Sequence, residues 1–187
     1  MNPQVTAEYI ASQFKEMTRT TPISDISVSM ICTASTINRS TFYYYFKNKD
    51  ELIRWMIHHD ISSRFYEASK HTWKHNVTLL LKEFYDHPSL YTEILNGPHA
   101  TTLTSSLYNM TNTTNLQGME SVLQGRELDK QDRSFLSSFF AHAFTGMYTD
   151  YIRSGCTEAP EQYASRFEPV VNHGFFETVT RLSNQSE

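Results

Sequence analysis

The sequence has few of the residues from which disulfide scaffolds, metal clusters and flexible linkers are built. Its 187 residues include two cysteines, six glycines and six prolines. Cys32 and Cys156 lie far apart, and neither has a Cys or His neighbour at a metal-ligand spacing, so neither a disulfide framework nor a zinc knuckle is indicated. No apolar run approaches the length of about 18 residues that spans a membrane, and the N-terminus has no signal-peptide pattern. These absences predict a soluble, cytoplasmic protein without a membrane segment.

Patterns that indicate catalysis are also missing. No Ser-His-Asp order, glycine-rich phosphate loop or paired-carboxylate motif can be read from the spacing. His71 and His75 have the i, i+4 spacing of a metal-ligand pair, and residues 58–60 (HHD) offer further possible ligands. The spacing does not fix which residue would be the third ligand. A solvated helix face is the simpler interpretation. The sequence therefore predicts no enzyme, no metal site and no cofactor.

Carboxylates are absent from one internal window, between Asp25 and Asp50. The whole chain has a formal net charge of −4, but residues 1–55 carry six basic and five acidic side chains, so the acidic excess lies in the remaining residues. A window of this length without a carboxylate allows a polyanion such as nucleic acid to approach.

The residues that are present predict helices. Hydrophobic residues make up 39% of the chain and charged residues 19%, which is enough for a substantial core in one domain or two small ones. Ala7, Ile10, Phe14 and Met17 are spaced 3, 4 and 3, which is the stripe of an amphipathic helix. That helix should end before Pro22, because proline disfavours a helical residue in front of it.

Two short helices are predicted next, joined by the small polar run TASTIN. Ser27 can cap the first helix, which carries Ile31 on its inner side. Asn38 can cap the second, in which Phe42 and Phe46 fall one turn apart. Two short helices joined by a tight turn, the second fixed to the core by aromatic rings, form a helix-turn-helix. The second helix of that motif enters the major groove of DNA.

A longer fourth helix should follow and run from Lys49 to about Lys70, with Asn48 as its cap. The chain stays helical beyond it, and two long segments close it, residues 132–154 and 161–182. The expected helix breaks are at His87-Pro88, Asn96-Gly97-Pro98, Gly125 and residues 155–160.

The stretch ISVSMICTASTINRSTFYYYFKNKDEL, residues 26–52, resembles the DNA-binding signature of the TetR family of transcriptional regulators. The resemblance covers residues 5–57 and is most specific from Thr41 to Leu52. Two positions depart from the pattern. Thr36 stands where glycine usually supplies a positive φ, and Met30 stands where an acidic residue commonly completes a capping box. NRSTFYYYF followed by ELIRWMI is especially similar to regulators of dihydroxyacetone kinase operons, some of which are activators.

The resemblance implies an all-α fold, with a three-helix helix-turn-helix domain in residues 1–48 and a helical ligand-binding and dimerisation domain in residues 49–187. It implies a homodimer on a pseudo-palindromic, double-stranded DNA operator, controlled by an unknown small-molecule effector, either as a repressor or as an activator. The alternative is a TetR-like co-activator or adaptor that acts through its C-terminal domain without reading an operator.

The resemblance also implies which residues meet DNA. Arg39 is expected to read a base, because a guanidinium can bond guanine O6 and N7 together. Tyr43 and Lys49 are expected to contact the phosphate backbone, and Tyr45 belongs either to this surface or to the core. The full predicted set is Ser27, Ser29, Arg39, Ser40, Thr41, Tyr43, Tyr44 and Lys49.

The last two segments carry more apolar surface than one internal face requires, which predicts a two-fold dimer built as a four-helix bundle. The residues are Phe135, Phe139, Ala143 and Met147 on one segment and Val170, Val171, Gly174 and Phe175 on the other, with Gly146 and Gly174 allowing close approach. Aromatic residues on several helices either fill the core or line a pocket for a small, largely apolar or aromatic effector. These residues are Phe65, Tyr66, Trp73, Phe84, Tyr108 and Phe144.

Overall fold

A computed structural model describes the backbone of residues 3–66 and 73–184, and the side chains of residues 4–62 and 73–184. All the regular secondary structure in these residues is helical. The N-terminal part contains α1 (Pro3–Met17), the short η1 (Ile23–Asp25), α2 (Val28–Ala34), α3 (Arg39–Tyr45) and α4 (Lys49–Tyr66). The prediction for the first helix is confirmed, because Ala7, Ile10 and Phe14 are buried and α1 ends at Met17.

Local hydrogen bonds start the next three helices where the sequence predicts. The Ser27 Oγ accepts a hydrogen bond from the Met30 amide at 3.3 Å. The Asn38 Oδ1 accepts one from the Thr41 amide at 2.7 Å, and the Asn48 Oδ1 accepts one from the Glu51 amide at 2.8 Å. Each cap satisfies an amide that has no partner inside its own helix, which fixes the first turn of that helix.

The C-terminal part continues as helices whose ends match the predicted breaks. They are α5 (Trp73–Asp86), α6 (Pro88–Asn96), α7 (Ala100–Leu123), α8 (Lys130–Arg153), α9 (Pro160–Ser165), α10 (Phe167–Pro169), η3 (Val170–Phe176) and α11 (Glu177–Ser183). The closing segment was predicted as a single helix, but it is divided, and η3 is a π-helical stretch. This wider stretch follows Pro169, which has no amide hydrogen to donate.

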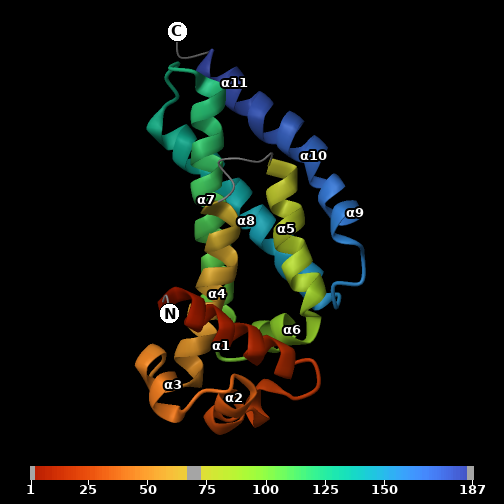
Figure 1. The fold of residues 1–187 in the computed structure, drawn as a ribbon. Helices are drawn as coiled ribbons and strands as arrows, with labels where there is room; N and C mark the ends of the chain where they lie inside the picture. The colour runs from red at the N-terminus through yellow and green to blue at the C-terminus, as the bar shows by residue number, and fades with distance from the viewer. Residues whose placement is uncertain (1–2, 67–72, 185–187) are drawn as a thin grey trace.

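The helices form an elongated molecule with the two short helices α2 and α3 at one end and the C-terminus at the other (Figure 1). α7 packs along α8, and α4 leaves the N-terminal helices and packs against both α7 and α5. One hydrophobic core extends through the described residues, from Ala7 in α1 to Val179 in α11. α4 therefore connects the end that carries α3 with the rest of the molecule.

A buried cluster of charged side chains links α1 to α4 and α5. The Lys15 Nζ on α1 lies 2.6 Å from the Asp60 Oδ2 on α4 and 2.7 Å from the Glu83 Oε1 on α5. The Tyr91 Oη on α6 lies 3.1 Å from the same Asp60 oxygen and 3.3 Å from the same Glu83 oxygen. Burial disfavours the charge of Asp60, but the His59 imidazole, whose Nδ1 lies 3.6 Å from the Asp60 Oδ1, and the Lys15 ammonium outweigh this effect and hold the pKa of Asp60 below its usual value.

Candidate nucleic-acid interface

The turn between α2 and α3 has the left-handed geometry for which glycine is usually required. Thr36 has a φ of 54°. The Ile37 amide donates to the Cys32 carbonyl at 3.0 Å, and the Thr36 amide donates to the Thr33 carbonyl at 3.1 Å. This pair of bonds is the Schellman motif, which ends a helix with one residue in the left-handed conformation. A β-branched residue adopts that conformation with strain, so this turn keeps its geometry at an energetic cost.

α3 has an inner aromatic face and an outer polar face. Phe42 is 0% exposed and Phe46 is 2% exposed, so both rings are anchored in the core. Tyr43 and Tyr44 are 53% and 76% exposed, and Arg39 is also exposed. The helix therefore presents a guanidinium and two phenol groups outward from a fixed base. Such groups can reach base edges and phosphate oxygens.

Three further residues of α3 make contacts within the chain, unlike the outward-facing side chains of the same helix. Tyr45 is half-buried and packs against the core, so of the two roles left open for it the core is the one seen here. The Ser40 and Thr41 hydroxyls donate to the Asn38 Oδ1 at 2.6 and 2.9 Å. Their hydrogens are thus engaged by the cap, which leaves the lone pairs of the two oxygens to accept hydrogen bonds.

On α2, the predicted Ser27 and Ser29 are exposed on the outside of the motif. The exposed Met30 and Thr33 accompany them and were not in the predicted set. The sequence signal that could have found them is the helical spacing, since Thr33 follows Ser29 by one turn.

Lys49 was predicted to meet the phosphate backbone, and in this structure its ammonium contacts the chain itself. It donates to the carbonyls of Ile23 at 2.5 Å, Ile26 at 2.8 Å and Ser24 at 3.3 Å, and so holds the loop before α2 against the start of α4. The neighbouring Lys47 is exposed, and sequence reasoning omitted it although it lies in the same window without carboxylates.

Two carboxylates, Asp50 and Glu51, follow the stretch between Asp25 and Asp50 that lacks acidic residues, and both contact other groups of the chain. The Asp50 Oδ1 lies 3.0 Å from the His99 Nε2, and the Glu51 Oε2 accepts a hydrogen bond from the Lys47 amide at 2.6 Å. These contacts hold the two carboxylates against nitrogen atoms of the same chain.

Comparison with known proteins identifies this arrangement. Residues 19–56 match the bacterial regulatory proteins of the tetR family, and residues 71–173 match a transcriptional regulator C-terminal region. The chain belongs to the TetR family. It is therefore a transcriptional regulator with an N-terminal helix-turn-helix domain and a helical C-terminal domain, and not an enzyme.

One sequence relative and one solved structure are similar to it. The HTH-type dhaKLM operon transcriptional activator DhaS of Lactococcus lactis subsp. lactis (strain IL1403) is 32% identical over 91 residues. That match covers 48% of this chain and 49% of the relative, so it spans about half the length of each. A solved structure named dihydroxyacetone kinase operon activator DhaS superimposes with a TM-score of 0.78. It covers 91% of this chain and 96% of its own at 20% identity, which shows the shared fold.

The C-terminal helices of this TetR-family regulator border a partly open, largely apolar cavity of about 580 Å³. Among the predicted pocket residues, Trp73 and Phe144 line it, together with Phe175 and Phe176. Phe84 instead fills the core against Tyr91, with the ring centroids 4.7 Å apart, so its predicted place in a pocket is wrong.

Tyr108, another predicted pocket residue, does not line this cavity. Tyr108 lies beside a different hollow and packs on the His142 ring at 4.7 Å. The side chains of Phe65 and Tyr66 lie outside the described residues. A tertiary arrangement of helices, and not the aromatic content of each helix, decides which rings meet in the cavity.

An apolar surface patch runs along α8 and reaches the start of η3. Phe135 and Phe139 are 64% and 55% exposed, and their rings stack at 6.0 Å. Ala143, Met147 and Val170 continue the patch beside a groove of about 520 Å³.

The assignment of Val171 and Phe175 to such an external face is wrong. Each is 3% exposed and packs inside its own chain. A Cβ added to Gly174 would lie at van der Waals distance, 3.5 Å, from the Phe140 ring of the same chain, so this position faces the interior of its own chain. Gly146, in contrast, has open space around it.

Two further findings concern only the described residues. None of their helices is both long and apolar enough to cross a membrane. Their His, Cys, Asp and Glu side chains also form no group of three or more placed to hold a metal ion, and His71 of the sequence-derived pair lies outside them.

Proposed function

We propose that this regulator is a homodimer that binds a pseudo-palindromic operator in double-stranded DNA, with residues 1–48 as the DNA-binding domain and residues 49–187 as the regulatory domain. The observation that carries the proposal is the outer face of α3. Arg39, Tyr43 and Tyr44 project from a helix fixed by two buried phenylalanines, in a window without carboxylates. This is the arrangement that a recognition helix needs in the major groove.

Each exposed group has a distinct part in this proposal. Arg39 reads a guanine through two parallel hydrogen bonds. Tyr43 and Tyr44 donate to phosphate oxygens, and a rigid ring does so with little loss of rotamer entropy. Ser27 and Ser29 at the start of α2 and Ser40 and Thr41 on α3 add polar contacts to the backbone and base edges. Lys49 supports the loop before α2, while its positive charge adds to the attraction of DNA.

The apolar patch on α8 supports the homodimer. Large exposed apolar patches on a protein of this size are normally covered by a partner, and a two-fold axis lets the same patch cover itself. Phe135, Phe139 and Met147 form its centre, and the open space at Gly146 lets two helices approach closely. A two-fold dimer carries two recognition helices, so the half-sites should lie roughly 34–36 Å apart or a multiple of that spacing.

The cavity of about 580 Å³ supports control by a small-molecule effector that is largely apolar or aromatic. Its size is within the range of about 300–1,000 Å³ that is typical of ligand sites, and the Trp73 and Phe144 rings with nearby amides fit an aromatic guest. To change operator affinity, the effector must bind the dimer with one spacing of its recognition helices more tightly than the dimer with a different spacing. A tenfold change in operator affinity needs about 1.4 kcal/mol of such preference.

The relative that is named an activator of the dhaKLM operon supports activation, rather than repression, as the action of this chain on a related operon. The deciding experiment is a titration of the purified protein with DNA from the region upstream of its own gene, combined with footprinting. We expect protection of two half-sites related by a two-fold axis, and an affinity well above that for random duplex. Equal affinity for both duplexes at several salt concentrations would contradict operator reading and favour an adaptor role.

A further inference from the structure

The loop before α2 is held by a side chain from the C-terminal part of the chain. This loop contains η1 (Ile23–Asp25), and α2 starts three residues after it ends. The Ile23 amide donates a hydrogen bond of 2.8 Å to the Glu93 Oε2 on α6, 70 residues further along the chain. Figure 1 shows α6 beside the loop that leads from α1 to α2. α6 therefore contacts the helix-turn-helix directly, and this contact does not pass through α4.

The Ile23 amide needs this partner because its own helix offers none. The first amides of a helix have no acceptor within that helix, and Pro22, which precedes η1, supplies no side-chain cap. On its other side η1 is held by the Lys49 ammonium, which donates to the carbonyls of Ile23, Ser24 and Ile26. Ile23 thus has a carboxylate from α6 on its amide and an ammonium from α4 on its carbonyl. Hydrogen bonds to charged groups are stronger than neutral ones, so the loop is fixed to both helices.

The loop passes this restraint on to α2 through a short, anchored segment. The Asp25 amide donates to the Pro22 carbonyl at 3.0 Å, and the Ile26 amide donates to the Ile23 carbonyl at 3.3 Å. The Ile26 side chain is 1% exposed, so it is fixed in the core. Ser27 follows at once as the cap of α2. A displacement of Ile23 therefore displaces the first turn of α2, and with it α3, which packs against α2.

The corner between α6 and α7 makes a second contact with the same end of the molecule. The His99 Nε2, directly before α7, lies 3.0 Å from the Asp50 Oδ1 in the first turn of α4. Gly97 ends α6, and a Cβ at this position would lie 2.8 Å from the Glu93 carbonyl, so the corner is tight. Glu93 and His99 therefore hold the loop before α2 and the start of α4 from one compact corner.

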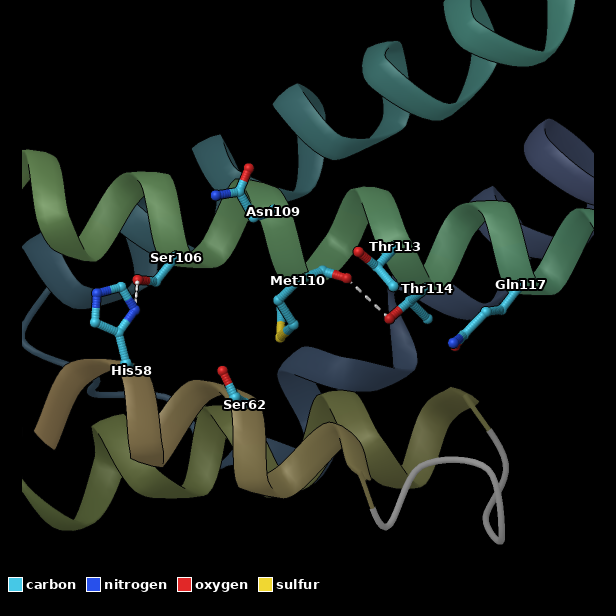
Figure 2. A pocket seen from close by; sticks show the side chains of 8 residues that line it. All are labelled: His58, Ser62, Ser106, Asn109, Met110, Thr113, Thr114 and Gln117. Carbon is cyan, nitrogen blue, oxygen red and sulfur yellow. Dashed lines mark hydrogen bonds between the residues drawn. The ribbon is translucent and has the colours of Figure 1, made fainter. Parts of the chain in front are cut away.

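α4 alone fixes the N-terminal helices less firmly than a fully packed helix would. From its middle onward, a hollow of about 340 Å³ lies between α4 and α7 (Figure 2). Beside this hollow the His58 Nδ1 and the Ser106 Oγ form a hydrogen bond of 3.0 Å. Helices that border a hollow lack part of the close packing that prevents them from shifting. Contacts outside α4 therefore help to orient the N-terminal helices: Lys15 supplies one for α1 through Glu83, and Glu93 supplies one for α2.

We infer that Glu93 is a positioning residue for operator reading, an inference that rests on the proposed function. Its carboxylate acts through the Ile23 amide and the loop before α2, and not by touching DNA. This contact fixes the tilt of each helix-turn-helix against the C-terminal part of its own chain. In the proposed dimer that tilt sets the distance and angle between the two α3 helices, so Glu93 restricts the half-site spacings that the dimer accepts.

The test compares Glu93→Ala, Glu93→Gln and Thr92→Ala in the full-length protein. Alanine removes the acceptor of the Ile23 amide, whereas the side-chain carbonyl of glutamine keeps it. Thr92→Ala is the matched control, because the Thr92 hydroxyl on the same helix donates to the Ile152 carbonyl within the C-terminal part. Fluorescence anisotropy measures binding to the operator, to operators with one base pair added or removed between the half-sites, and to a single half-site. One base pair moves a half-site by about 3.4 Å and turns it around the DNA axis.

We expect the unaltered protein, Thr92→Ala and Glu93→Gln to prefer the natural spacing. Glu93→Ala should bind the operator about three- to tenfold more weakly, because fewer dimers hold the matching spacing, and its preference for the natural spacing should fall by at least about threefold. Its affinity for a single half-site should not change, since α3 itself is unaltered. In the DNA-free protein, NMR hydrogen exchange at the Ile23 amide should be at least about tenfold faster in Glu93→Ala than in Thr92→Ala.

The inference fails if Glu93→Ala keeps the spacing preference and the Ile23 exchange rate of the Thr92→Ala control, or if Glu93→Gln behaves like Glu93→Ala. It also fails if Glu93→Ala loses the same factor on the operator and on the single half-site, because that result indicates a damaged α3 and not a changed tilt. The unaltered protein separates the two proposals. If it does not distinguish the operator from random duplex, the proposed function fails and the role of Glu93 fails with it. If it does, and Glu93→Ala binds every duplex as the control does, only the role of Glu93 is overturned.

Discussion

The Lys15 ammonium on α1 lies 2.6 Å from the Asp60 carboxylate on α4, and both side chains are almost fully buried. With Glu83 as a second acceptor at 2.7 Å, this contact fixes the orientation of α1 relative to the C-terminal helices. A buried charge without its partner is strongly unfavourable, whereas an exposed pair contributes little.

Lys15→Met should therefore lower the free energy of unfolding by about 3–5 kcal/mol, because it leaves two buried carboxylates close together without the Lys15 ammonium. Lys82→Met is the matched control, since it breaks an exposed pair with Asp86 on the same protein and should cost less than about 1 kcal/mol. Urea denaturation of both variants measures the difference. Similar small losses in both would show that the buried cluster does not hold α1 in place.

His59 makes the stability depend on pH. Its contact with Asp60, whose Oδ1 lies 3.6 Å from the His59 Nδ1, together with the charges of Asp60 and Glu8, raises the pKa of His59 above its usual value despite burial. The folded state therefore holds the proton more tightly than the unfolded state, and this contribution is fully present below about pH 6.5 and is lost as the pH rises through the raised pKa.

His59→Gln should accordingly lose stability at low pH and much less at high pH. Urea denaturation of both proteins between about pH 5.5 and pH 8.5 gives the difference at each pH. Burial lowers the pKa of His87, which has the opposite effect, but both proteins contain His87 and it largely cancels in the difference. A difference that is constant, or that grows as the pH rises, would show that the His59 proton is not held in the folded state.

Thr36→Gly should stabilise the protein by about 0.5–1 kcal/mol. It removes the strain of a β-branched residue at a φ of 54°, at the cost of greater freedom in the unfolded chain. Thr33→Gly, three residues earlier inside α2, should instead destabilise by roughly 0.3–0.5 kcal/mol, because glycine is less favourable inside a helix than threonine. The two unfolding curves should move in opposite directions, and a shift in the same direction would mean that Thr36 is not strained.

On DNA, Arg39→Ala and Lys47→Ala should have different effects. The first should cost about 1–3 kcal/mol on the operator and relax the preference at one base pair. The second should weaken binding to operator and random duplex alike and reduce the slope of log affinity against log salt by about one.

Lys49→Ala should weaken all duplexes alike and also lower folding stability, because three carbonyls lose their donor. Fluorescence anisotropy at several salt concentrations tests this, and an equal loss on both duplexes for Arg39→Ala would refute base reading.

Phe139→Asp should convert the proposed dimer to a monomer, because it places a charge in the middle of the apolar patch on α8. Tyr85→Asp changes another exposed aromatic residue, on α5 and outside the patch, and should leave the dimer intact. Sedimentation velocity at micromolar concentration distinguishes the two states. A monomeric unaltered protein would remove the basis for a two-fold operator.

The local features of this fold could be predicted from the sequence because they depend on neighbouring residues. The caps at Ser27, Asn38 and Asn48 and the breaks at proline and glycine act within one or two turns, so their spacing is enough to place them. The outward face of α3 followed from the single interval between Phe42 and Phe46.

The amino-acid sequence by itself thus determined the helices, the helix-turn-helix and the family pattern. Only the tertiary structure decided how each helix is rotated against its neighbours. That rotation buried Val171 and Phe175 within the chain, placed Phe84 in the core, and turned the Lys49 ammonium to the loop before α2. It also brought Lys15 to Glu83, 68 residues away. Periodicity shows that a helix has an apolar face, but the partner of that face is chosen by packing between distant segments, which local spacing does not encode.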